Sequence, residues 1–362
     1  MKNAPVGSAE NRKVFATFAD LTADLMRKAI LTVLLLLLAT GMRAQLVEYC
    51  YFEARGSYNG TWSDSSFEGK LTGDFLNFHL KGQLAPGLSY RIRQRFTKPL
   101  YDPKVPLNAT DLLTLTWDIN EKWSLDAGKL PVFIGGFEWD DAPIDLYYFS
   151  DFAKTIPQVY ALGGTAYFRP VQNQTLHLQV TQSLLAEGNW DAWNASLGWT
   201  GQFFNWWKTL WGINFMDDPY HHMMGYLALG NRFEAGPVAL ELDGMYRRSF
   251  KQKKAGLDLT VIGKLEYKVG KFTLFAKGGY DTNAANNVDE EGIAYDLTVA
   301  PGSSILWGGG GLEFFPLRNQ DLRIHTVVYG DNFSKSVIVK AGLTFRLYLK
   351  RPLTRKRCAA LP

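Results

Sequence analysis

Five basic side chains in two neighbouring segments have the clearest chemical potential in this sequence. Arg91, Arg93 and Arg95 occupy every second position of one short segment, and Lys81 and His79 do so in the segment before it. In extended strands, residues two apart share a face and lie about 6.5–7 Å from each other. A guanidinium stays charged and binds phosphate or carboxylate through two parallel hydrogen bonds. These five residues, the basic row, could therefore pass an anion from one cation to the next.

The opposite charge gathers in one long connection, residues 131–156, which is also rich in aromatic side chains. Its acidic residues are Glu138, Asp140, Asp141, Asp145 and Asp151. A connection of this length inside a compact protein is usually functional. If it folds inward, it narrows the passage and sets carboxylates opposite the arginines. The resulting transverse field would orient permeating solutes.

Plainer interpretations of both groups stay open. The basic row could be a solvated polar face whose charge is balanced by neighbouring carboxylates such as Asp118 and Asp126. The acidic connection could be an external lid or a contact between subunits, since surface loops commonly have such roles.

The elements that must position these residues show a two-residue period. After residue 45, apolar and polar residues alternate in many segments, as in Leu176, Leu178 and Val180 against His177 and Gln179. Such segments are typical of strands with one apolar and one polar face. The sixteen expected strands are 48–56, 72–84, 87–98, 110–119, 122–130, 157–170, 174–184, 190–201, 207–216, 221–234, 236–248, 257–268, 271–281, 304–315, 320–329 and 335–349.

Short turns alternate with longer connections between these segments. The longer ones are 57–71, 99–109, 131–156, 249–256 and 282–303. With an even number of strands, this is how an outer-membrane β-barrel is organised. An arginine on the lipid side at mid-membrane would cost about 2–4 kcal/mol, so the three arginines are expected to face the lumen.

The sequence thus predicts an all-β fold, a transmembrane antiparallel β-barrel of about 16 strands whose third long loop folds inward. A soluble sandwich or propeller also alternates and is the alternative fold. Aromatic residues gathered at strand ends, as at 203–207, favour the barrel because such rings prefer the membrane–water interface.

Residues 1–44 are expected to be a presequence. Residues 29–40 form a continuous apolar run after a short basic segment, and Ala44 is a small residue at the expected cleavage site. This is the pattern of a secretory signal peptide, and the run is too short to span a membrane. Met26 is an alternative start, because a complete signal begins there. Residues 45–362 then form one exported barrel domain.

Three blocks of sequence carry a family resemblance. They are Leu76 to Gln83 with Leu88 to Arg95, Ala127-Gly128-Lys129 leading into Ile134 to Glu138, and Ala142 to Tyr147. These blocks resemble the phosphate-selective porin O/P family in its Bacteroidetes form, most densely over residues 72–170. The resemblance implies a homotrimeric outer-membrane channel with the third loop folded inward. It also implies an anion-binding role for the residues that match the family's basic row, namely Arg91, Arg93, Arg95 and Lys81.

Other constellations carry less chemistry. Asp217 and Asp218 lie near His221 and His222, but adjacent histidines lack the spacing of a zinc site. No Ser-His-Asp set stands out, so no catalytic residue, metal, cofactor or nucleic-acid partner is expected. The net charge of the whole chain is +4, yet residues 45–349 hold 28 basic and 32 acidic side chains. Any anion preference must therefore come from where the arginines lie.

These observations together favour a porin of the bacterial outer membrane that is not an enzyme. It would let small hydrophilic solutes diffuse passively, with a bias toward anions such as phosphate. Its expected partners are small anionic or polar solutes, outer-membrane lipid, further copies in a homotrimer and the barrel-assembly machinery. The alternatives are a strictly phosphate- or polyphosphate-specific channel, and a barrel hydrolase or adhesin.

Overall fold

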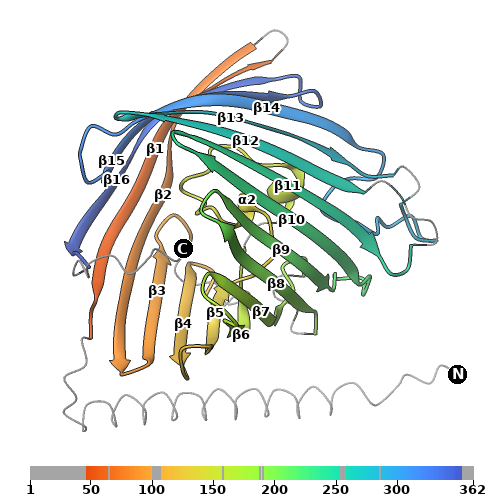
Figure 1. Ribbon diagram of the computed structural model, residues 1–362. Helices are drawn as coiled ribbons and strands as arrows, with labels where there is room; N and C mark the ends of the chain where they lie inside the picture. Colours follow the sequence, from red (N-terminus) through yellow and green to blue (C-terminus); the bar gives the residue numbers. More distant parts are fainter. Residues whose placement is uncertain are drawn as a thin grey trace, which may run out of the picture.

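Sixteen antiparallel strands form one closed barrel in which the last strand, β16, pairs with the first, β1 (Figure 1). The computed structural model describes residues 46–63, 66–99, 107–156, 159–186, 189, 191–252, 256, 258–284 and 287–352. Among these residues, no helix is long and apolar enough to cross a membrane. The predicted presequence, 1–44, lies outside the described residues.

The strands follow one another around the barrel in chain order. They are β1 Tyr49–Ser63, β2 Ser66–Ala85, β3 Leu88–Arg95, β4 Thr110–Asp118, β5 Trp123–Pro131, β6 Tyr160–Phe168, β7 Gln174–Gln182, β8 Trp193–Phe204, β9 Trp207–Met216, β10 Met224–Ala235, β11 Val238–Ser249, β12 Leu259–Val269, β13 Phe272–Thr282, β14 Ser304–Phe314, β15 Leu322–Asp331 and β16 Val337–Lys350. The predicted fold class is confirmed.

The barrel is apolar outside and polar inside, which inverts the pattern of a soluble protein. On β7, Leu178 is 60% exposed on the outer face, whereas the neighbouring Gln179 is 2% exposed on the inner face. Ile324 and Val328 on β15 repeat the pattern, with His325 buried between them on the inner side. An outer surface of this kind is stable in contact with lipid, because the alternation presents mostly apolar side chains to it.

The structure differs from the sequence prediction most at the first hairpin. β1 extends to Ser63 and β2 begins at Ser66, so the loop expected at 57–71 is mostly strand. This hairpin rises above the neighbouring barrel rim (Figure 1). The two-residue period continues through the stretch, but its Gly, Ser and Asn residues resemble turn signals. Elsewhere, each predicted strand end lies within three residues of the observed one.

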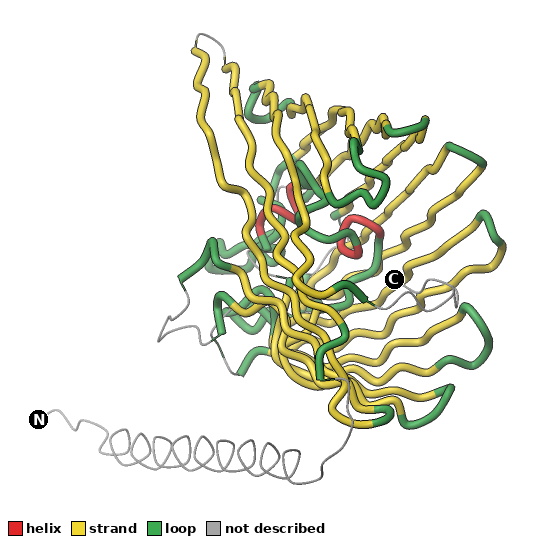
Figure 2. Tube along the Cα trace, turned by 90° about the vertical axis from the view of Figure 1, so that its left-hand side faces the viewer, coloured by secondary structure: helices red, strands yellow, loops and turns green. Residues whose placement is uncertain are grey.

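The segment between β5 and β6, which we name L3, folds into the barrel. It contains two short helices, α2 at Phe137–Asp140 and α3 at Asp151–Thr155. Figure 2 shows both helices surrounded by the strands. The inward fold predicted for the third long loop is therefore confirmed.

Two apolar clusters hold L3 inside the barrel. The larger joins L3 to the wall around β9–β11, and the smaller joins Tyr147 and Tyr148 of L3 to Ile262, Trp307 and Val327 on the wall. Apolar burial of this kind stabilises a loop by roughly 1.5–3 kcal/mol for each fully buried large side chain. L3 is thus a packed part of the barrel interior.

Candidate functional site

L3 begins by crossing a glycine surface on β8 and β9. A Cβ at Gly198 would lie 2.1 Å from the Phe133 ring, and one at Gly212 would lie 2.2 Å from the carbonyl oxygen of Ile134. Gly135 of L3 adopts φ +99°, a conformation that side chains disfavour. Close approach therefore requires glycine on both sides of this contact.

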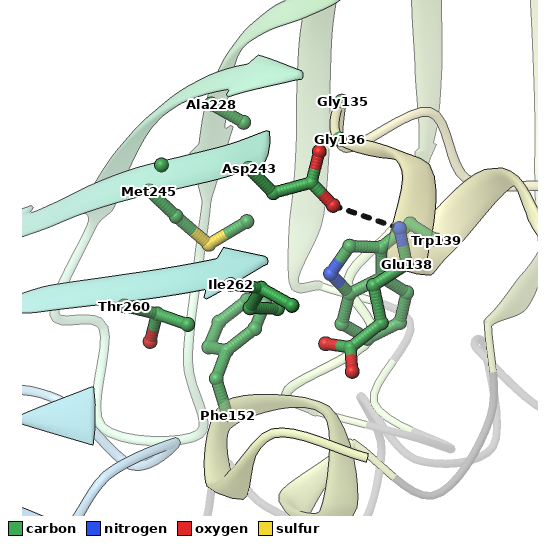
Figure 3. Close-up of a pocket in the computed structure, with 11 residues that line it drawn as sticks. Gly135, Gly136, Glu138, Trp139, Phe152, Ala228, Asp243, Met245, Thr260 and Ile262 are labelled. Carbon is green, nitrogen blue, oxygen red and sulfur yellow. Dashed lines mark hydrogen bonds between the residues drawn. The ribbon is translucent and has the colours of Figure 1, made fainter. Parts of the chain in front are cut away.

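Helix α2 is fixed to β11 by one half-buried carboxylate, that of Asp243 (Figure 3). Asp243 accepts hydrogen bonds from the backbone N–H groups of Phe137 and Glu138, each at 2.9 Å. Trp139 and Phe152 of L3 close a small cavity beside it, which has room for about one water molecule. Because Asp243 satisfies the free N–H groups at the start of α2, it sets where the acidic part of L3 lies.

Glu138 forms a buried ion pair with β13. Its carboxylate lies 2.7 Å from Nζ of Lys277 and also accepts a hydrogen bond from the backbone N–H of Ser150 at 2.9 Å. Both charged side chains are buried. Removing one partner of such a pair leaves an uncompensated buried charge, which costs about 3–5 kcal/mol. Glu138 therefore anchors L3 and is not open to solutes.

The other predicted loop acids differ in their surroundings. Asp141 pairs with Lys264 at 3.0 Å, and Asp145 pairs with Arg323 at 2.8 Å. Asp151 lies beside β13, where its backbone N–H donates to Asp281 at 2.9 Å. Asp140 is exposed, but the surrounding wall keeps part of the bulk water away and Asp141 adds negative charge, so its pKa rises to about 6.

Two arginines outside the predicted site bind the backbone of L3 at its tip. Arg55 on β1 donates to the carbonyl oxygens of Ile144 and Leu146, at 2.8 and 2.7 Å. Arg323 on β15 donates to the same Ile144 oxygen at 2.9 Å. Both lie on inward positions of the predicted alternation. Their position on the polar face was thus readable from the sequence, but their contacts with residues far along the chain were not.

The predicted basic row lies on the inner face of β2 and β3, in the order the sequence suggested. His79 stands opposite Arg93 and Lys81 opposite Arg91 across the two strands. Arg93 donates to the Tyr160 hydroxyl at 2.7 Å, and its Nε lies 3.2 Å from Asp111. Arg95 binds the same Asp111 carboxylate at 3.0 Å.

Most of the charge of the basic row is compensated, but not by the acids suggested from the sequence. Asp111 neutralises part of the arginine charge, Glu48 lies 3.4 Å from Nζ of Lys81, and Glu53 lies 3.3 Å from Nε2 of His79. Asp126 instead accepts a hydrogen bond from Tyr167 on β6. Arg91 is exposed and has no ion pair or hydrogen bond with any described residue.

L3 contacts most of the barrel wall but not the strands that carry the basic row. Contacts of the described L3 residues reach Gln179 on β7, Gly198 on β8, Asn214 on β9, Tyr226 on β10, Asp243 on β11, Lys264 on β12, Lys277 on β13, Glu313 on β14, Arg323 on β15, Arg346 on β16 and Arg55 on β1. In the described part of L3, no hydrogen bond, ion pair or ring contact goes to β2, β3 or β4. We name the inner face of these three strands the ladder wall.

Two further loops meet at the same end of the barrel, and one of them contacts L3. Thr155 of L3 donates to the carbonyl oxygen of Thr298, in the loop after β13, at 2.7 Å. His222, after β9, lies 3.1 Å from Asp218 and 3.5 Å from Asp289 of that later loop. Within the described ranges, no group of three or more His, Cys, Asp or Glu side chains is arranged to hold a metal.

A serine, a histidine and an aspartate do meet inside the barrel, but not as a hydrolase triad. Ser57 Oγ donates to Asp74 at 2.7 Å and lies 3.4 Å from Nε2 of His325. In a triad the histidine accepts the serine proton and the carboxylate orients the histidine. Here the carboxylate holds the serine itself, and Nδ1 of the buried His325 has no partner. The group fits a structural role in the wall.

Comparison with solved structures supports the fold. The chain is similar to a porin refined at 1.8 Å resolution, with 10% identity, a TM-score of 0.52, and coverage of 82% of this chain and 100% of that one. It is also similar to OmpT, an outer membrane protein of Vibrio cholerae, with 9% identity, a TM-score of 0.56, and coverage of 82% and 96%. No family model and no curated protein matches the sequence.

Proposed function

We propose that this protein is a channel of the bacterial outer membrane through which small hydrophilic solutes diffuse passively. The observation that carries the proposal is the combination of a lipid-compatible outer surface with a polar lumen narrowed by L3. Its similarity to a solved porin concerns the fold and is consistent with this role. The basic row and the loop acids would then line the path.

We further propose that solutes pass along the ladder wall and that anions are favoured there. L3 packs against the remaining walls, so the space beside β2, β3 and β4 is the side it leaves free. Arg91 is exposed on this wall, and Lys81 and Arg95 are partly exposed. Fixed positive charge in a narrow aqueous path raises the local concentration of anions.

Strict phosphate specificity and trimeric assembly remain finer proposals that rest on the family resemblance. A phosphate-specific channel would need guanidinium groups that are free to donate hydrogen bonds to the anion. In this structure, Arg93 and Arg95 are already engaged with Asp111. The geometry therefore favours a general anion bias over strict phosphate specificity.

Planar-bilayer recording of the purified, refolded protein tests the proposal. We expect a stable conductance, and in a potassium chloride gradient a zero-current potential displaced toward the chloride equilibrium potential. Heat-modifiable migration on a gel verifies that the barrel is folded before insertion. A folded, inserted protein without conductance would contradict the channel, and a displacement toward the potassium potential would contradict the anion bias alone.

A further inference from the structure

Asp111 stands at an irregularity in the pairing of β3 with β4. Arg93 pairs with Leu112 and the next residue, Gln94, pairs with Thr110, so Asp111 is the extra residue of a β-bulge. Regular alternation would send Asp111 outward, because Leu112 is buried on the inner side. A bulge re-aims the side chain it carries. Here it turns a carboxylate from the lipid side toward the arginines.

The bulge places this carboxylate between two members of the basic row. Asp111 is 0% exposed, and its Oδ2 lies 3.2 Å from Nε of Arg93 and 3.0 Å from Nη2 of Arg95. Its Oδ1 and the Nη2 of Arg93 are buried without a hydrogen-bond partner. Buried polar atoms are normally satisfied, so unpartnered donors and acceptors at one place are informative. Asp111 thus compensates the charge of the two arginines without satisfying every N–H donor of Arg93.

We propose that Asp111 is a built-in counter-ion that sets how strongly the channel favours anions over cations. The proposal rests on the channel function and deepens it. A permeating anion must compete with Asp111 for the two guanidinium groups. Asp111 meets the guanidinium groups through Oδ2 alone, which accepts hydrogen bonds from Nε and Nη2 of Arg95 at 3.2 and 3.0 Å. Asp111 therefore lowers the preference for anions over cations, because it neutralises part of the positive charge of the ladder wall.

Asp111→Asn tests this proposal, because asparagine keeps the shape and one acceptor but removes the charge. We expect the chloride-to-potassium permeability ratio to rise roughly threefold or more, as two masked arginines become available. Asp111→Glu keeps the charge and should stay near the wild type in this measurement.

Asp126→Asn is the matched control, since it removes an inner-wall carboxylate that is bonded to Tyr167 rather than to the arginines. Equal selectivity in the wild type and Asp111→Asn, or equal shifts in Asp111→Asn and Asp126→Asn, would overturn the role of Asp111 while leaving the channel intact. If no folded, inserted variant conducts and the wild type does not either, the channel function itself fails, and the proposal with it. Heat-modifiable migration verifies that each variant is folded.

Discussion

The ladder wall and the wall that faces it across the lumen use charged residues in different ways. β3 and β11 stand eight places apart in the closed order of sixteen strands, so they face each other. On the β11 side, the half-buried Asp243 binds the backbone of L3, and the buried Lys277 binds its Glu138 carboxylate. On the β3 side, Arg91 is exposed, and the described part of L3 makes no hydrogen bond, ion pair or ring contact with the wall.

The difference shows how one barrel can combine a rigid constriction with a polar path. On the covered wall, Lys264, Lys277 and Arg323 meet acidic partners supplied by L3, and each pair fixes the loop against that wall. Charges on the ladder wall meet partners from neighbouring strands, such as Asp111, which leaves the wall itself independent of L3. The position of the loop, and not the total charge of the barrel, then decides which side chains a solute meets.

Displacing L3 from the covered wall should have the largest effect on this asymmetry. In Gly212→Val, the new Cβ would meet the Ile134 backbone at 2.2 Å, a contact that neither segment can absorb without moving. We expect L3 to move away from β9 and the single-channel conductance to rise about twofold or more, because the constriction widens. Planar-bilayer recording measures this directly.

Gly244→Val is the matched control for that substitution. It lies on β11, and a Cβ there meets no atom within 4 Å. Its conductance should equal that of the wild type. A Gly212→Val channel with unchanged conductance would show that the contact of L3 with β9 does not control the width of the path.

A smaller effect is expected from the titration of Asp140. The pKa of this carboxyl is raised to about 6, because the barrel removes part of its hydration and Asp141 lies nearby. Above that pH the group is charged, and below it the lumen loses one negative charge. Lowering the pH from 7.5 to 5 should therefore shift the zero-current potential slightly further toward the chloride potential. Asp140→Asn should abolish most of that shift; an identical shift in this variant would assign the titration to another group.

Much of the fold was predictable because the strands show a two-residue alternation of apolar and polar residues in the sequence. Alternation at residues such as Leu176 and Leu178 depends only on neighbouring positions, and each such segment needs one lipid face. The inward fold of the third loop was also predictable, since aromatic side chains such as Tyr147 and Phe152 would be costly in a solvated loop. The hairpin at 57–71 was missed because its small polar residues resemble turn residues.

The electrostatic details of the site were not predictable in the same way. Asp111 reaches Arg95 only because a bulge interrupts the alternation, and a bulge of one residue leaves no periodic signal. Glu138 and Lys277 are 139 positions apart in the sequence, so no local sequence pattern predicts their ion pair. The charges of the basic row were visible in the sequence, but the residues that compensate them depend on which strands are neighbours.

The central claim is that solutes pass along the ladder wall and that its arginines favour anions. The zero-current potential of a triple variant tests this claim most directly. Arg91→Ala, Arg93→Ala and Arg95→Ala together remove the arginines of this wall, and the matched control removes three exposed charges elsewhere, at Arg248, Lys271 and Arg318. We predict that the arginine variant, folded and inserted, loses the displacement toward the chloride potential while the control keeps it. An arginine variant with the selectivity of the wild type would contradict the account.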